Sequence, residues 1–92
     1  MIINFADKRT ETFYSSGKGR LPENIQRKAL MLLQILDAAE DIKDMASPPG
    51  NRLHTLSGNL AGYYSVSINM QFRIIFRFEN GNAYDVKIAD YH

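Results

Sequence analysis

The sequence has 92 residues, a formal net charge of +1 and no cysteine. This length suits a modest core, so we expect one domain over residues 1–92. The absence of cysteine excludes disulfides, thiolate nucleophiles and cysteine-ligated zinc, and the near-neutral charge argues weakly against strongly electrostatic nucleic-acid binding. No apolar run is as long as a membrane span, and the first residues lack a secretion-signal pattern. We therefore expect a cytoplasmic protein without membrane contact.

The first half of the chain predicts two helices. Residues 1–5 form a short apolar run, which we expect to be an edge strand. Asp7 is a suitable N-cap for a helix over residues 8–16, and Pro22 suits the first position of a longer helix. In this longer helix apolar residues recur at three- and four-residue steps through at least Ala39, so one side can cover a sheet. These residues are Ile25, Ala29, Leu32, Leu33, Leu36 and Ile42.

A polar connector is expected between the helical half and the rest of the chain. Prolines and glycine in residues 47–50 are expected to end the helical region. Residues 51–59 predict a compact connector with one helical turn, anchored to the core by its two leucines. His54 and Ser57 would then share one side of that turn.

Residues 61–92 predict three antiparallel strands. Runs of β-branched and aromatic residues are separated by turn signals at residues 68–71 and 79–82. Alternation gives each strand one apolar side. These sides are Tyr64, Val66 and Ile68, then Phe72, Ile74, Phe76 and Phe78, then Tyr84, Val86 and Ile88. Helices covering this face would complete an α+β fold.

The remaining polar residues of this stretch suit acid–base chemistry on a phosphodiester. Arg73 and Arg77 occupy the other face of the second strand, and the third strand runs into Asp90, Tyr91 and His92. Arginine can hold a phosphate by two parallel hydrogen bonds, and histidine carries protons near neutral pH. RNA cleavage needs little more than an acid, a base and a fixed cation, and each acid or base contributes roughly 10²–10⁴-fold. In a regular strand, however, Asp90 and His92 point to the core side, so meeting Arg73 requires a twist, a bulge or an early strand end.

The residues alone leave other functions open, and they favour a small α+β binding domain over a ribonuclease. The two strand arginines could be solvated or paired with Glu79 or Asp85, and the terminal residues could pack or fray. His54, Asp90 and His92 lack the spacing of a known zinc site. Neither a G-x-S-x-G motif nor a phosphate-binding glycine loop is present.

Four segments resemble the HigB-type branch of the RelE superfamily of bacterial toxins, also called plasmid maintenance killer proteins. They are PPGNRLHTLSGN, GYYSVSIN, QFRIIF and NGNAYDVKIADYH, which follow the family's order and spacing over about half the chain. The resemblance implies a RelE-like (microbial-ribonuclease-like) α+β fold, with N-terminal helices packed on a twisted antiparallel sheet. It also implies an endoribonuclease toxin (mRNA interferase) of a type II toxin–antitoxin system, which cleaves mRNA in the ribosomal A site without metal or cofactor. A weak or inactive binding module that acts with its antitoxin as a co-repressor is the alternative.

Position by position, the resemblance implies catalytic roles for His54, Arg73, Asp90, Tyr91 and His92. Arg73 would stabilise the scissile phosphate, and Tyr91 would stack on a base or contact phosphate. Asp90 and His92 are the acid–base candidates, and the resemblance does not say which is the acid and which the base. The implied product carries a 2′,3′-cyclic phosphate on its 5′ fragment.

One position departs from the family pattern. Ser57 stands where some HigB toxins carry a lysine, three residues after the histidine. This change removes a cation and leaves the strength of cleavage open. We expect Arg52, Arg77 and Lys87, together with Ser57, to contact the substrate.

The family also implies a protein partner, a helix-turn-helix antitoxin of the HigA type. The toxin–antitoxin complex of the family commonly represses its own promoter, so operator DNA would be contacted through the antitoxin. The apolar stripe of residues 22–46, or the segment of residues 8–20, is our hypothesis for the docking surface.

Overall fold

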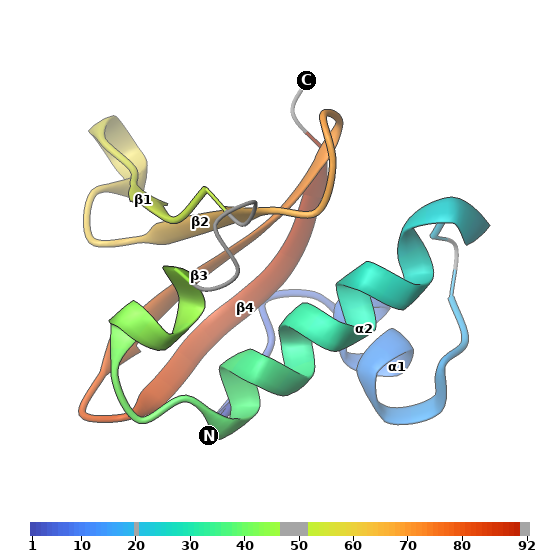
Figure 1. The fold of residues 1–92 in the computed structure, drawn as a ribbon, viewed down its shortest axis with the longest axis horizontal. Coiled ribbons are helices and arrows are strands. Elements are labelled where there is room, and N and C mark those ends of the chain that lie inside the picture. The colour runs from blue at the N-terminus through green and yellow to red at the C-terminus, as the bar shows by residue number, and fades with distance from the viewer. Residues whose placement is uncertain (20, 47–51, 91–92) are drawn as a thin grey trace.

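The computed structural model describes residues 1–19, 21–46 and 52–90. Helices α1 (Lys8–Ser16) and α2 (Glu23–Ala38) and the 3₁₀ helix η1 (Ile42–Ala46) precede an antiparallel sheet (Figure 1). The sheet order is β1-β2-β3-β4. Its strands are β1 (His54–Thr55), β2 (Tyr64–Ser67), β3 (Phe72–Glu79) and β4 (Asn82–Asp90), with a second 3₁₀ helix, η3 (Gly58–Leu60), between the first two. Within these residues no helix has the length and hydrophobicity that crossing a membrane requires.

Both predicted helices form, and their ends follow from local chemistry. The Asp7 carboxylate accepts a hydrogen bond from the Thr10 N–H at 2.9 Å, which satisfies an otherwise unpaired donor at the start of α1. Gly17 ends α1 in the left-handed conformation. Pro22 precedes α2, which ends at Ala38, with Ala39 as its C-cap. The predicted stop at residues 47–50 lies outside the described residues.

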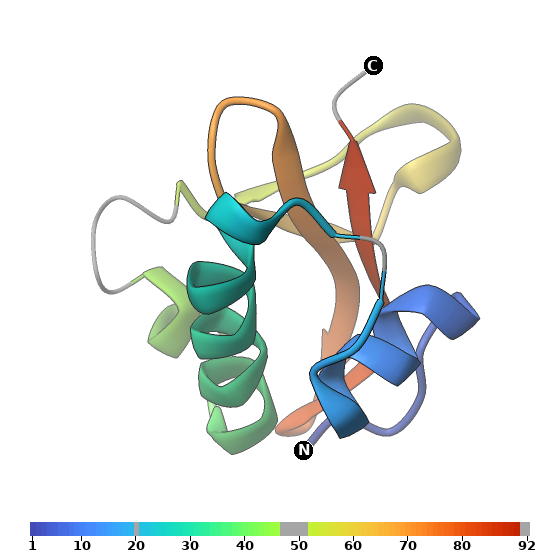
Figure 2. The same cartoon turned by 90° about the vertical axis from the view of Figure 1, so that its right-hand side faces the viewer.

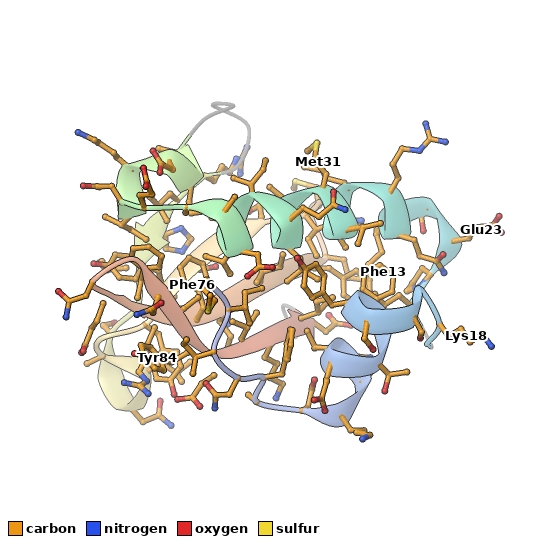
Figure 3. All side chains as sticks on the ribbon, turned by 90° about the horizontal axis from the view of Figure 1, so that it is seen from below. Phe13, Lys18, Glu23, Met31, Phe76 and Tyr84 are labelled. Atoms are coloured by element: carbon orange, nitrogen blue, oxygen red, sulfur yellow. The ribbon has the colours of Figure 1, made fainter. Side chains whose placement is uncertain are left out.

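The core lies between α2 and one face of the sheet, as the apolar periodicity predicts. Figure 2 shows α2 alongside the sheet and α1 beside β4. Phe13 extends from α1 into the space between the two helices (Figure 3) and is buried. Side chains from every layer are fully buried, among them Leu32, Leu33, Leu36, Val66, Ile74, Phe76, Val86 and Ile88.

The pairing of β3 with β4 contains one irregularity that the sequence alternation did not predict. Ile75 pairs with Lys87, but Arg77 pairs with Tyr84, so β4 carries an extra residue between them. Asp85 lies in this bulge at φ 53°. An extra residue reverses which side chains face the core, so the prediction that Tyr84 faces the core is wrong. Figure 3 shows Tyr84 on the side of the sheet away from Phe76 and α2.

The connector before β2 also differs from its prediction. His54 and Thr55 form an edge strand that pairs with Ser65 and Tyr64, and the one helical turn comes later, at η3. His54 and Ser57 therefore do not share a turn. The reason is that the chain at His54 is extended by pairing with β2, and this pairing overrides the local turn preference.

The N-terminal run lies at the opposite edge of the sheet. Parallel bridges join Ile2 to Ala83 and Phe5 to Val86, so this segment runs beside β4 as predicted, although it makes isolated bridges and no continuous strand. Asp37 of α2 holds the same segment, because its carboxylate accepts from the Ile2 N–H at 2.7 Å and from the Tyr14 hydroxyl at 2.8 Å. Burial, reinforced by this carboxylate, raises the pKa of Tyr14 from 10.0 to about 12.

The Tyr14–Asp37 contact predicts a stability change at alkaline pH. Because the folded state holds the Tyr14 proton more tightly than the unfolded state, its contribution is complete below pH 10 and is lost as the pH rises towards 12. We expect Tyr14→Phe to lower the free energy of unfolding at pH 7 by about 1 kcal/mol. We also expect its urea midpoint to fall less than that of the wild type between these pH values. If the urea midpoints of the wild type and Tyr14→Phe fall equally with pH, the assigned role of the Tyr14–Asp37 contact is wrong.

Candidate functional site

Strand pairing gathers several predicted site residues on the sheet face away from α2. His54 pairs with Ser65, Ser65 with Ile75, and Ile75 with Lys87. Residues that pair directly across antiparallel strands point to the same face, so His54 and Lys87 share this outer face. Arg73 precedes Ile75 by two residues and therefore shares it too.

Arg73 lies on this outer face near the start of β3, an inner strand of the sheet, and is half-buried. Its cross-strand partners are Ser67 on β2 and Ala89 on β4, two small side chains. Lys87 is a diagonal neighbour of Arg73, and such neighbours are about 7–8 Å apart. Two cations thus lie close together, and their nearest neighbours on this face are uncharged: Ser65, Ser67, Ile75 and Ala89.

His54 is exposed at the β1 edge, and its ring orientation is set by a backbone carbonyl. Its Nδ1 lies 2.9 Å from the carbonyl oxygen of Arg52. A carbonyl only accepts, so Nδ1 carries the proton and the neutral ring presents Nε2 as a proton acceptor. Arg52 has a left-handed backbone (φ 52°), and this bend allows its carbonyl to reach the ring two residues later. The arrangement suits His54 as a general base.

Asp90 is the last described residue of β4. It pairs with Phe72, so the strand parity places it on the side of Ile88, opposite to the face of Arg73. It is exposed there, and the Gln71 amide donates to its carboxylate at 3.1 Å. Tyr91 and His92 lie outside the described residues, so their roles remain predictions from the sequence.

Arg77 belongs to a cluster around Asp85 that the sequence did not reveal. Its Nε donates to the Asp85 carboxylate at 3.0 Å, and its guanidinium lies 5.3 Å from the centre of the Tyr84 ring. The Asn4 amide donates to the other carboxylate oxygen at 2.9 Å, and the Tyr63 hydroxyl donates to the oxygen that Arg77 contacts, at 3.4 Å. The hydrogen bonds from Asn4 and Arg77 lower the pKa of Asp85, and the bond to Asp85 raises the pKa of Arg77. Of the alternatives open for Arg77, pairing with Asp85 is the one observed.

Ser57 lies beyond the end of β1. It precedes η3, and its carbonyl accepts from the Leu60 N–H at 3.3 Å. It is exposed, as is Lys87. Within the described part of the chain, no three histidine, aspartate or glutamate side chains form a group that could hold a metal ion.

Comparison with known proteins identifies the family. Residues 3–92 match the model of the RelE-like toxin of type II toxin–antitoxin system HigB. The chain belongs to this HigB-like toxin family. As a type II toxin it has a cognate antitoxin as its partner. The resemblance inferred from the sequence motifs is confirmed.

Two relatives of this HigB-like toxin carry names that bear on its activity. Toxin HigB-1 of Vibrio cholerae serotype O1 is 41% identical over 85 residues, which are 90% of each chain. Endoribonuclease HigB of Proteus vulgaris is 38% identical over 93 residues and aligns with all of both chains. The name of the second relative states a nuclease activity for that protein.

Solved structures support the predicted fold of the toxin. The YoeB–YefM toxin–antitoxin complex from Staphylococcus aureus has a chain that matches with a TM-score of 0.63 at 20% identity, covering 100% of this chain and 95% of that one. The YoeB/ParE toxin from Agrobacterium tumefaciens matches with a TM-score of 0.51 at 14% identity, covering 97% and 95%. The α+β prediction of two helices on an antiparallel sheet is confirmed.

The Asp85 cluster predicts a loss of stability in acid. Because the folded state lowers the pKa of Asp85 from its usual 3.8, the contribution is present above that value and is lost as the pH falls below it. We expect the urea midpoint of the wild type to fall more steeply than that of Asp85→Asn between about pH 5 and 3. Asparagine tolerates the left-handed backbone, which makes it a suitable replacement.

The Arg77→Met variant provides a control for this comparison. This variant keeps the Asp85 carboxylate and its hydrogen bond from Asn4. The change of its urea midpoint with pH should therefore lie between that of the wild type and that of Asp85→Asn. Parallel curves for the wild type and Asp85→Asn would contradict the assigned role of Asp85.

Proposed function

We propose that this toxin is a ribosome-dependent endoribonuclease that cleaves mRNA in the ribosomal A site by metal-independent acid–base catalysis. The observation that supports this most directly is the presence of His54 and Arg73 on one outer face of the sheet, with Nδ1 of His54 2.9 Å from the Arg52 carbonyl oxygen. The name of the Proteus vulgaris relative supports the same activity.

The proposed reaction is an internal transfer at phosphorus. Nε2 of His54 accepts the proton of the 2′-hydroxyl, the 2′-oxygen bonds to phosphorus, and the bond from phosphorus to the 5′-oxygen breaks. A protonated side chain delivers a proton to the departing 5′-oxygen. Of the two predicted candidates, Asp90 lies on the face opposite to Arg73, so His92 is the proposed acid. The products are a 2′,3′-cyclic phosphate and a free 5′-hydroxyl, so atoms and protons balance without a metal.

Arg73 would stabilise the charge that grows on the phosphate oxygens. The Cα atoms of His54 and Arg73 lie roughly 12 Å apart, two strand spacings across and two residues along. Extended side chains can close that span around one phosphodiester. A fixed cation at the transition state is worth about 10²–10³-fold. Lys87, the diagonal neighbour of Arg73, would bind the same or an adjacent phosphate.

The other predicted substrate contacts differ in how their charge is used. The Arg77 guanidinium is paired with Asp85 and stacked over Tyr84, so much of its charge is neutralised. We therefore expect Arg77 to contribute less to phosphate binding than Arg73. Arg52 and Ser57 flank β1, where they would contact the RNA backbone beside His54.

The proposed partners follow the family. We propose a helix-turn-helix antitoxin of the HigA type, with operator DNA contacted through that antitoxin, and action on ribosomes in the cytoplasm. The predicted docking surfaces are the apolar stripe of residues 22–46 and the segment of residues 8–20. Most of the stripe is buried in the core, so on α2 we propose its exposed margin, where Met31 is 40% exposed.

A co-repressor without catalysis is the second candidate. Two observations favour it: Ser57 supplies no cation, and Asp85 neutralises much of the charge of Arg77. Both reduce the positive charge available to RNA.

Comparing two arginine variants tests the nuclease proposal. Arg73→Ala should lower single-turnover mRNA cleavage on programmed ribosomes by about 10²–10³-fold, whereas Arg77→Ala should lower it less than about tenfold. Mapping of mRNA 5′ ends, with ribosome-free RNA in parallel, measures both. An Arg73→Ala variant that cleaves as fast as the wild type would contradict the assigned role. Absence of cleavage by the wild type would favour the co-repressor.

The proposed base gives a separate prediction. His54→Gln keeps a polar side chain at the β1 edge but lacks a group that accepts a proton near neutral pH. We expect its cleavage rate to fall by roughly 10²–10⁴-fold while its ribosome affinity is retained. Rate and affinity can be separated by single-turnover kinetics at increasing ribosome concentration. An unchanged rate would mean that another group is the base.

A further inference from the structure

The Asp85 bulge turns an aromatic ring towards the outer face of the sheet. Strand alternation predicts that Tyr84 lies in the core with Val86, but the extra residue reverses the parity, and Tyr84 is instead half-buried opposite Arg77. Figure 3 shows Tyr84 on the side away from α2. The left-handed backbone at Asp85 (φ 53°) has an energetic cost, and such outliers and bulges are concentrated at functional sites. The redirected ring is therefore a candidate for binding.

Arg77 and Tyr84 form a rigid pair on this face. The Cζ atom of Arg77 lies 5.3 Å from the centre of the Tyr84 ring, within the range of a cation–π contact. Nε of Arg77 donates to the Asp85 carboxylate at 3.0 Å, and the Tyr63 hydroxyl donates to the same oxygen at 3.4 Å. The guanidinium is thus held in place before any ligand arrives, which lowers the entropic cost of binding.

The pair is also accessible to a ligand. The Arg77 side chain is 40% exposed, and both Tyr63 and Tyr84 are half-buried. An aromatic ring that only packs in the core is fully buried, as Phe76 is on the opposite face. The pair is therefore fixed by the fold but open to solvent, which suits binding better than core packing.

The chemistry of the pair suits a nucleobase. Bases stack on tyrosine rings and on the planes of arginine guanidinium groups, and every base offers a face for such stacking. A phosphate is a poorer ligand for this pair, because the Asp85 carboxylate neutralises much of the guanidinium charge and would itself repel an anion.

The pair shares a strand face with the residue proposed to hold the scissile phosphate. Arg77 follows Arg73 by four residues on β3, so both point to the same side, with their Cα atoms roughly 13 Å apart. On this face of β3 only Ile75 lies between them, and its side chain is apolar. An RNA strand with its scissile phosphate at Arg73 can continue along β3 to the pair. This placement favours RNA over a protein as the ligand.

We propose that Tyr84 and Arg77 form a stacking site for one base of the mRNA near the scissile bond. The inference deepens the proposed function and rests on it for the identity of the substrate. It does not depend on which groups act as acid and base. The stacked base fixes how the neighbouring nucleotides lie, so the site binds and orients the substrate and takes no part in proton transfer.

A double-mutant cycle between one side chain and one base tests the contact on the ribosome. Tyr84→Leu removes the aromatic ring but keeps an apolar side chain, and a series of mRNAs lacks one base at a time near the cleaved bond. With intact mRNA we expect Tyr84→Leu to lower the single-turnover rate at subsaturating toxin by about 5- to 100-fold. At one abasic position the two changes together should cost no more than either alone, because both remove the same contact. Additive losses at every position would overturn the proposal.

Two further variants separate stacking from stability. Tyr84→Phe keeps the ring and loses only the hydroxyl, so its rate should remain within about threefold of the wild type. If Tyr84→Phe loses as much activity as Tyr84→Leu, the ring is not what matters and the proposal is overturned. Arg77→Met removes the guanidinium from a partly exposed position and should couple to the same base. It decides the question if Tyr84→Leu does not fold.

Tyrosine ring resonances of the wild-type toxin provide a binding test that needs no cleavage. The probes, at millimolar concentration, are a 2′-O-methylated RNA hexamer, which cannot form the cyclic product, and an abasic hexamer of equal charge. We expect the RNA alone to shift the Tyr84 ring resonances. Tyr14, whose hydroxyl bonds to Asp37 of α2, is the internal control and should not respond. Equal shifts with both probes, or no shift with RNA, would overturn the stacking site.

Failure of the stacking site and failure of the proposed function give different results. A wild type that cleaves mRNA but shows additive losses in the cycle would overturn the stacking site alone. A wild type that does not cleave would overturn the proposed function, and a Tyr84 shift with RNA but not with the abasic strand would then still support the stacking site.

Discussion

The extra residue that β4 carries at Asp85 determines which side chains reach each face of the sheet. On one side of the bulge the pairing with β3 keeps Val86 and Ile88 in the core and Lys87 on the outer face. On the other side the parity is reversed, so Ala83 is buried and Tyr84 lies over Arg77. The left-handed backbone at Asp85 costs conformational energy, which the hydrogen bonds to its carboxylate and its N–H offset. Asn4 makes two of these bonds, so the bulge also fixes the N-terminal segment.

One edge of the sheet is covered and the other is open, and this difference suits the proposed activity. The β4 edge is covered by the N-terminal segment and by α1. The β1 edge is only two residues long, and a short edge strand offers little template for unwanted pairing. Its shortness leaves His54 exposed next to a face that α2 does not cover. A substrate as large as the proposed ribosome-bound mRNA would need such an open approach.

The parts of the fold that depend on neighbouring residues could be predicted from the sequence. The Asp7 cap, the apolar side of α2 and the alternation in β2 and β3 are all local patterns. The β1 strand and the Asp85 bulge could not be predicted, because β1 is extended only through its pairing with β2 and the bulge is held by Asn4, which is 81 residues away in the sequence. The same distinction holds for the site. Alternation predicted that Arg73 faces away from the core, whereas the His54–Arg52 contact requires a backbone bend that no residue pattern indicated.

The distribution of charge supports the proposed dependence on the ribosome over cleavage of free RNA. Affinity for free nucleic acid grows with the number of phosphates that cations neutralise. The net charge here is only +1, and Asp85 offsets Arg77, so Arg73 and Lys87 are the main strand cations on the outer face within the described residues. Two such cations can orient one scissile phosphate but bind a flexible strand weakly. If the ribosome supplies the binding and presents the mRNA, the toxin needs only a few well-placed groups. In that case the position of each group matters more than the total charge.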